Sequence, residues 1–159
     1  MKKSIVYSTV TGNARNLGEH ISKTLGDSSY CGPLSDEAIE ADLVFVGFWT
    51  TKFSCDDKVK AFLGKLKDKK VFLYGTAGYD FTEEFFNGII EEVKKSVDPS
   101  CEVVGSFMCQ GKVSDAKQKA IKDADEEKYN SMKENLDKSV SHPDASDLDA
   151  LAKAIQGAL

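Results

Sequence analysis

The sequence feature that most restricts the fold is residues 42–48, Asp-Leu-Val-Phe-Val-Gly-Phe, the most apolar stretch of the chain. A strand with one face in water alternates apolar and polar side chains, and this stretch has no such alternation. An uninterrupted apolar run is typical of a parallel strand that helices cover on both faces. We therefore expect residues 42–48 to form a central strand of a parallel sheet.

Four other apolar segments are predicted strands, and amphipathic helical patterns separate them. These strands cover residues 4–7, 28–31, 70–74 and 101–109. The helical patterns cover residues 13–25 and 56–67, a stretch after Thr82 and the C-terminal residues, with a short turn at 35–41. Alternating strands and helices with right-handed crossovers give an α/β fold with a doubly wound five-stranded parallel sheet. The 159 residues suit a single domain, 1–159, that buries about 70% of its unfolded surface.

The connection after the first predicted strand is rich in hydroxyl and amide groups and suits an anion. It reads Ser8-Thr9-Val10-Thr11-Gly12-Asn13-Ala14. The first backbone N–H groups of a helix lack intrahelical partners and lie at the positive end of its dipole, where a phosphate is stabilised. We expect Asn13 to be the N-cap of the helix that follows. The alternative is that this loop only caps its own helix.

This loop lacks the residues that two other phosphate-binding folds require. It has no Gly-Lys-Ser/Thr sequence, which argues against a nucleoside triphosphate with magnesium. It has one glycine, Gly12, whereas a dinucleotide-binding turn uses three. We therefore expect a single phosphate group, held by hydroxyl and amide groups.

Residues 7–14, Tyr-Ser-Thr-Val-Thr-Gly-Asn-Ala, resemble the Thr/Ser-x-Thr-Gly-Asn-Thr phosphate loop of the flavodoxin family, which holds the phosphate of FMN. The resemblance implies the strand order 2-1-3-4-5 and FMN as the cofactor, bound where the strand order reverses; flavodoxins are a well-known example of that placement. Ala14 departs from the family pattern, since many relatives have threonine there. Arg15 could compensate for the missing hydroxyl group with a charge contact; the alternative is that it lies solvated on the outer face of the helix.

Two further loops meet the phosphate loop at the carboxyl edge of such a sheet, and both carry aromatic residues. We predict that Trp49 and Tyr79 stack on the two faces of the flavin ring, with Phe53 and Phe81 as the alternatives. Hydroxyl and backbone groups of the same loops are expected at the edge of the ring. These remaining candidate cofactor-binding residues are Thr50, Thr51, Lys52, Gly75, Thr76, Ala77 and Gly78.

The loop after the third strand departs from a second family pattern. Many flavodoxins have a glycine there whose peptide flips to hydrogen-bond the flavin, and this chain has no glycine between Trp49 and Asp56. Phe53 occupies a corresponding position, and residues with a Cβ atom resist positive φ. We therefore expect the one-electron-reduced flavin to be stabilised less than in a typical flavodoxin.

The charge of the chain indicates its partners. A net charge of −5 argues against nucleic acid, whose binding proteins need a basic face. Acidic residues near the predicted cofactor loops would lower the reduction potential of a bound flavin and steer a basic partner, although they also stabilise helix N-termini. These residues are Asp56, Asp57, Asp80, Glu83 and Glu84. The resemblance implies redox partner proteins, a basic-faced reductase and an acceptor enzyme, and we expect a monomer.

The cysteines and the apolar runs indicate the compartment. Cys31, Cys55, Cys101 and Cys109 are widely spaced, which argues against a zinc site or a disulfide framework and favours the reducing cytoplasm. The N-terminal apolar segment is too short and polar for a signal peptide, and no run approaches transmembrane length. We expect no membrane association.

Residues 114–140 are an addition to the strand and helix alternation. They form a highly charged helical stretch with a thin apolar stripe. The simpler interpretation is a surface helix or helix pair packed on the edge of the sheet. The alternative is an insertion that covers the flavin or docks a partner. His142, which follows beside a proline, is expected in a loop without a catalytic role.

No catalytic triad, metal cluster or substrate domain is visible, so we predict an electron carrier whose FMN does the redox chemistry. One alternative is an FMN-dependent quinone or small-molecule reductase of the same fold. Another is a flavin-free scaffold that acts through residues 114–140. Fold alone does not decide among these functions.

Overall fold

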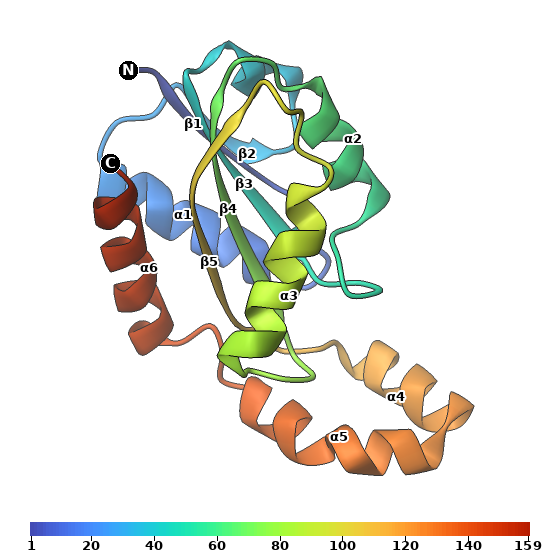
Figure 1. Ribbon diagram of the computed structural model, residues 1–159. Coiled ribbons are helices and arrows are strands. Elements are labelled where there is room, and N and C mark those ends of the chain that lie inside the picture. The colour runs from blue at the N-terminus through green and yellow to red at the C-terminus, as the bar shows by residue number, and fades with distance from the viewer.

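The computed structural model describes residues 1–159 and contains a five-stranded sheet (Figure 1). Its strands are β1 (Lys3–Tyr7), β2 (Tyr30–Pro33), β3 (Leu43–Trp49), β4 (Lys70–Ala77) and β5 (Glu102–Gln110). Every neighbouring pair is parallel, and the spatial order is β2-β1-β3-β4-β5. The predicted doubly wound sheet and its strand order are both confirmed.

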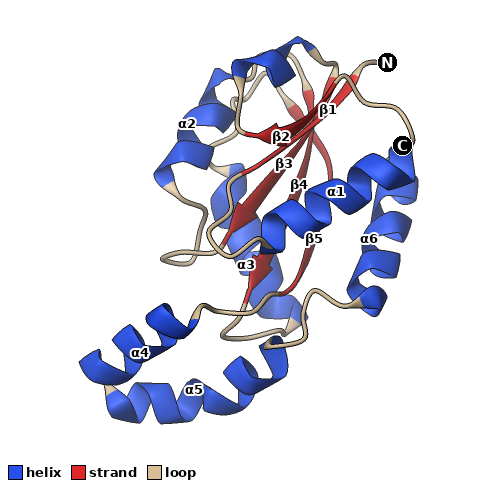
Figure 2. Ribbon diagram, turned by 180° about the vertical axis from the view of Figure 1, so that it is seen from behind, coloured by secondary structure: helices blue, strands red, loops and turns tan.

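Helices cover both faces of the sheet (Figure 2). On one face, α1 (Asn13–Leu25) and α6 (Ala145–Ala158) pack on the strands. On the other face lie the 3₁₀ helix η1 (Asp36–Glu40), α2 (Asp57–Lys65) and α3 (Glu83–Lys94). The two hydrophobic clusters that result are separated by the sheet, as a parallel sheet with crossover helices requires.

Strand β3 is the centre of the core. All of its residues are buried except Trp49 at its carboxyl end, which is partly exposed. Val44 and Val46 point to the α2 and α3 side, while Leu43 and Phe45 point to the α1 and α6 side. The apolar run therefore marks a strand buried on both faces, as its sequence predicts.

Strand β4 extends further than the sequence predicts. It continues past Tyr74 to Ala77, because Gly75 and Thr76 pair with the last two residues of β3. A Cβ atom on Gly75 would lie 2.4 Å from the ring of Phe48, so the glycine allows the two strands to stay paired at this point. The second strand is also displaced, from the predicted residues 28–31 to Tyr30–Pro33.

The ends of α1 are both formed by glycine. Gly12 is the N-cap, with φ of 90° and no side-chain cap, so the prediction that Asn13 caps the helix is wrong. The Nδ2 atom of Asn13 instead donates to the carbonyl oxygen of Lys112, at 2.9 Å. Gly26 ends the helix in the left-handed conformation, as expected for a glycine at this position.

Residues 114–140 form a helical hairpin of α4 (Asp115–Ala124) and α5 (Glu126–Ser139). The hairpin lies beyond the carboxyl ends of the strands (Figures 1 and 2). It does not pack on the lateral edge of the sheet, so the simpler interpretation of this segment is wrong. Its helices bury only Leu136 and Ser139, and it contacts the loops at the end of the sheet instead.

The C-terminal helix α6 begins at a side-chain cap and packs on the core through its apolar face. Asp144 is the N-cap of α6, Leu151 and Ile155 are buried, and Leu159 at the end of the chain is 59% exposed. All four cysteines are free. None of the helices combines the length and apolar character that a transmembrane span needs.

Candidate functional site

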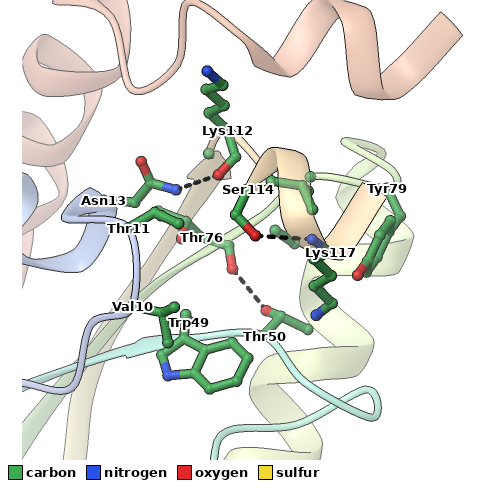
Figure 3. A pocket seen from close by; sticks show the side chains of 14 residues that line it. Val10, Thr11, Asn13, Trp49, Thr50, Thr76, Tyr79, Lys112, Ser114 and Lys117 are labelled. Carbon is green, nitrogen blue, oxygen red and sulfur yellow. Dashed lines mark hydrogen bonds between the residues drawn. The ribbon is translucent and has the colours of Figure 1, made fainter. Parts of the chain in front are cut away.

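A cleft opens at the carboxyl edge of the sheet, between the loops after β1, β3, β4 and β5 (Figure 3). Strand order reverses between β1 and β3, which is where doubly wound sheets bind ligands. The residues that line the cleft are Val10, Thr11, Asn13, Trp49, Thr50, Thr76, Ala77, Gly78, Tyr79, Gly111, Lys112, Val113, Ser114 and Lys117.

One end of the cleft is the loop between β1 and α1. The Thr9 side-chain oxygen accepts the N–H of Gly12 at 2.9 Å and holds the turn in shape. The neighbouring backbone N–H groups of Val10, Thr11, Asn13 and Ala14 have no hydrogen-bond acceptor within the protein. Unpaired N–H groups gathered at a helix N-terminus form a binding site for an anion.

The side chains of Ser8, Ala14 and Arg15 all point away from the cleft. The Ser8 hydroxyl donates to Asp56 at 2.7 Å, so it stabilises the loop from outside the cleft. The methyl group of Ala14 is fully buried against the core, and only the backbone N–H of this residue remains for a ligand. Arg15 does not compensate for the missing threonine, because its guanidinium pairs with Glu19 on the outer surface of α1.

The other end of the cleft is bounded by the two aromatic residues predicted to hold a ring, Trp49 and Tyr79. The ammonium group of Lys117, from α4, lies 5.3 Å from the centroid of each ring (Figure 3). A single cation within contact distance of both rings shows that Trp49 and Tyr79 bound the same slot. No local sequence signal distinguishes Lys117, which lies on a helix with many other charged residues.

Asp56 connects the two ends of the cleft. Its Oδ2 atom accepts hydrogen bonds from the Ser8 hydroxyl and from the indole N–H of Trp49, at 2.7 and 3.1 Å. Its Oδ1 atom accepts the N–H of Val59 and caps α2. The sequence predicts a stabilising acid at the start of this helix, but it gives no signal for the contacts with Ser8 and Trp49.

The end of β4 and the loop after it also line the cleft, through Thr76 and Ala77 of the strand and Gly78 and Tyr79 of the loop. The hydroxyl of Thr50 donates to the carbonyl of Thr76 at 2.8 Å, which ties this loop to the end of β3. A Cβ atom on Gly78 would lie 2.2 Å from the side chain of Val113, so only glycine fits there. Gly75 lies within β4 and does not line the cleft.

Three predicted cofactor residues, Thr51, Lys52 and Phe53, lie outside the cleft. Thr51 and Ser54 exchange two backbone hydrogen bonds and close a tight turn over Lys52 and Phe53. Both central residues have positive φ, 50° and 62°. The premise that residues with a Cβ atom avoid positive φ in this loop is therefore wrong, while the weaker stabilisation of reduced flavin stays a prediction.

The two alternative aromatic residues also point elsewhere. The ring of Phe53 packs edge-on against Phe85 of α3, with centroids 5.5 Å apart. Phe81 is 43% exposed and faces the ammonium group of Lys138 at 5.4 Å. Of the four aromatic candidates, Trp49 and Tyr79 line the cleft and Phe53 and Phe81 do not.

Buried beneath the phosphate-loop end, the hydroxyl of Tyr74 donates to the carbonyl of Val6 at 2.8 Å. Complete burial raises the pKa of Tyr74 well above its usual value, because the phenolate has no water to stabilise it. The hydroxyl thus stays protonated and holds the last part of β1, from which the anion-binding loop leaves.

Fold and cleft together define an α/β protein with a phosphate loop and an aromatic slot at its switch point. Comparison with known proteins agrees: the profile of the Flavodoxin domain family matches residues 4–156, and the chain belongs to this family. Family members of this kind hold FMN at the β1/β3 switch point.

Individual proteins are also similar to this chain in sequence or in fold. The flavodoxin-like domain-containing protein BilS of Clostridioides difficile is 30% identical over 159 residues, covering 93% of this chain and 90% of that protein. Oxidised Flavodoxin 2 from Bacillus cereus has a TM-score of 0.62 at 14% identity, with 99% of this chain and 97% of the other covered. The Trp repressor binding protein of Bacillus subtilis has a TM-score of 0.64 at 11% identity, with 97% of each chain covered. At such identities the two solved structures support the fold alone.

Proposed function

We propose that this chain binds FMN in the cleft and passes electrons one at a time from a reductase to an acceptor enzyme. The observation that carries the proposal is the pairing of two features at the switch point. Unpaired N–H groups lie at one end of the cleft, and two aromatic rings bound a slot at the other.

The phosphate end of FMN fits the loop between β1 and α1. A Cβ atom on Gly12 would meet nothing within 4 Å, so the loop is open to a ligand on that side. The N–H groups of Thr11, Asn13 and Ala14 would donate to phosphate oxygens, and the α1 dipole would stabilise the negative charge. The side chain of Thr11 lines the cleft and offers a hydroxyl group beside them.

The flavin ring fits the slot between Trp49 and Tyr79. Both residues are partly exposed, so their ring faces are available to a ligand. The hydrogen bond from Trp49 to Asp56 fixes the plane of the indole, and the chain on either side of Tyr79 is held by Gly78 and by Asn135 of α5. Stacking on aromatic residues would exclude water from both faces of the ring.

FMN supplies one-electron and two-electron redox chemistry when it is bound, so the protein has only to bind, orient and shield it. The groups that line the cleft suit this task, since they are hydroxyl, amide, aromatic and ammonium groups. The overall charge of −5 and the acidic first turns of α2 and α3 favour a reductase with a basic face. Four free cysteines agree with a reducing compartment such as the cytoplasm.

The proposal is tested by titrating the FMN-free protein with FMN and then reducing the complex stepwise. We expect quenching of FMN fluorescence with a stoichiometry of one, and transfer of electrons from a flavodoxin reductase to an acceptor such as cytochrome c. Absence of FMN binding by calorimetry would rule the proposal out.

A specific observation also favours a second function, an FMN-dependent reductase of quinones or other small molecules. A groove of about 430 Å³ adjoins the cleft and shares Thr50 and Tyr79 with it. Aromatic and apolar side chains of Phe53, Phe85 and Met132 line this groove, which suits an apolar acceptor molecule. Steady oxidation of NADH with a quinone by the FMN-loaded protein alone would favour this function over the carrier.

A further inference from the structure

Lys117 is the one residue of the α4–α5 hairpin that reaches the aromatic slot with a charged group. The backbone N–H of Lys117 donates to the hydroxyl of Ser114, the N-cap of α4, so the side chain leaves from a fixed first turn. Its ammonium group lies 5.3 Å from the centroids of both Trp49 and Tyr79 (Figure 3). A cation at this distance from an aromatic face is attracted to it.

We propose that Lys117 is a placeholder for the flavin ring. In the FMN-free protein its ammonium group occupies the slot between Trp49 and Tyr79, and it withdraws when the ring enters. This inference rests on the proposed binding of FMN, and it adds that the protein supplies its own competing occupant of the ring site. Lys117 is then a positioning residue that sets the rate of FMN entry.

The hairpin that carries Lys117 is weakly attached to the rest of the molecule. None of the residues of α4 is buried, and α5 buries only Leu136 and Ser139. Its polar contacts with the core go to the loop after β4, through the hydrogen bond from Asn135 to the carbonyl of Tyr79. A segment with so little buried surface opens at low free-energy cost, so Lys117 can leave the slot without disturbing the sheet.

The two cation–π contacts of Lys117 determine how strongly it slows entry of the flavin ring. Two cation–π contacts at a partly exposed site together favour the occupied slot by about 5- to 30-fold. A ligand that needs the empty slot binds only to the open fraction of molecules, and its apparent association rate falls by the same factor. Removing the cation should therefore speed entry of the ring by about 5- to 30-fold.

Trp49 is the only tryptophan of the chain, so its fluorescence reports on the slot directly. The experiment compares the FMN-free wild-type protein with Lys117→Met, which keeps the length of the side chain but removes the cation. Lys119→Met is the matched control, since Lys119 is an exposed lysine on the same helix and lies outside the cleft. Acrylamide should quench Trp49 more strongly in Lys117→Met than in the wild-type protein or the control.

Stopped-flow mixing with riboflavin then measures entry of the ring. Riboflavin has no phosphate group, so the loss of one positive charge does not change its electrostatic steering. We expect association about 5- to 30-fold faster for Lys117→Met, and wild-type rates for Lys119→Met and for Lys117→Arg, which retains a cation.

Unchanged Trp49 quenching, or association of riboflavin no faster in Lys117→Met than in Lys119→Met, would overturn the placeholder role. If these results came with normal FMN binding, the proposed function would stand without it. Failure of the wild-type protein and every variant to bind FMN would overturn both proposals.

Discussion

Replacing Gly12 with alanine should weaken FMN binding while leaving the fold intact. Gly12 has φ of 90°, a conformation that costs a residue with a Cβ atom about 1–2 kcal/mol. The added methyl group would meet no other atom within 4 Å, so the penalty comes from the backbone alone. The loop is partly exposed, and alanine can relieve the strain by a local change that withdraws the unpaired N–H groups.

The magnitude follows from that penalty. FMN would have to restore the strained loop on binding, so its dissociation constant should rise by about 5- to 30-fold. Riboflavin lacks the phosphate group that the loop binds, and its affinity should change little. The ratio of the two affinities, measured by fluorescence titration at one ionic strength, therefore isolates the contribution of the loop.

Gly26→Ala is the matched control for this experiment. Gly26 ends the same helix, also has positive φ, 74°, and also has open space around its missing Cβ atom. This substitution should lower the free energy of unfolding by about 1 kcal/mol and leave FMN affinity unchanged, because Gly26 lies at the far end of α1. Equal FMN affinities for Gly12→Ala and the wild-type protein would refute the assignment of the phosphate to this loop.

Three further substitutions test other parts of the site. Asp56→Asn should lower the free energy of unfolding by about 1–3 kcal/mol in urea and shift the emission of Trp49. The amide group has one acceptor oxygen in place of two, so it cannot accept all three hydrogen bonds that the carboxylate accepts; Asp57→Asn, next to it, should do neither. Tyr74 has a raised pKa, so its contribution to stability is intact below pH 10 and is lost as the pH rises above it. Above pH 10 the unfolding free energy of the wild-type protein should fall by about 1.4 kcal/mol per pH unit relative to that of Tyr74→Phe. An equal difference between the two proteins in urea unfolding at about pH 9 and pH 11 would contradict this. Leu136→Ala removes the only large apolar side chain that the hairpin buries, and it should speed hydrogen exchange in α4 and α5 but not in β3, where equal acceleration would indicate global unfolding instead.

Most of the sheet could be predicted from the sequence because its signals are local. The run at residues 43–48 needs both faces covered, whatever lies beside it. Thr82 begins α3 and Gly26 ends α1 through contacts within one turn. The 2-1-3-4-5 order came from the family resemblance, since no local pattern specifies which strands are neighbours. The end of β4 was missed because it depends on pairing with the last residues of β3.

The parts of the site that were missed all depend on distant contacts. Asn13 looks like an N-cap, yet its side chain bonds the carbonyl of Lys112, 99 residues away. Lys117 is one lysine among several on α4, and only the turn of the hairpin over the cleft distinguishes it from the others. Sequence patterns report which face of a helix is apolar, but they do not report which polar side chain reaches another loop.

The charges around the cleft show why distant contacts matter for the properties of the site. The acidic residues beside the loops suggest a negative environment for the cofactor, but Asp56 accepts three hydrogen bonds and Asp80 accepts the N–H groups of Phe81 and Thr82. Their charge is thus directed toward the protein's own donors. Lys117 places an ammonium group 5.3 Å from the centroids of both rings, while the Asp56 carboxylate lies 3.1 Å from the indole nitrogen of Trp49. Interactions between charges fall with distance, so these two groups dominate the local field. The local charge at the aromatic slot is therefore set by one lysine that can leave and one carboxylate that is held by hydrogen bonds, and the net charge of −5 does not describe it.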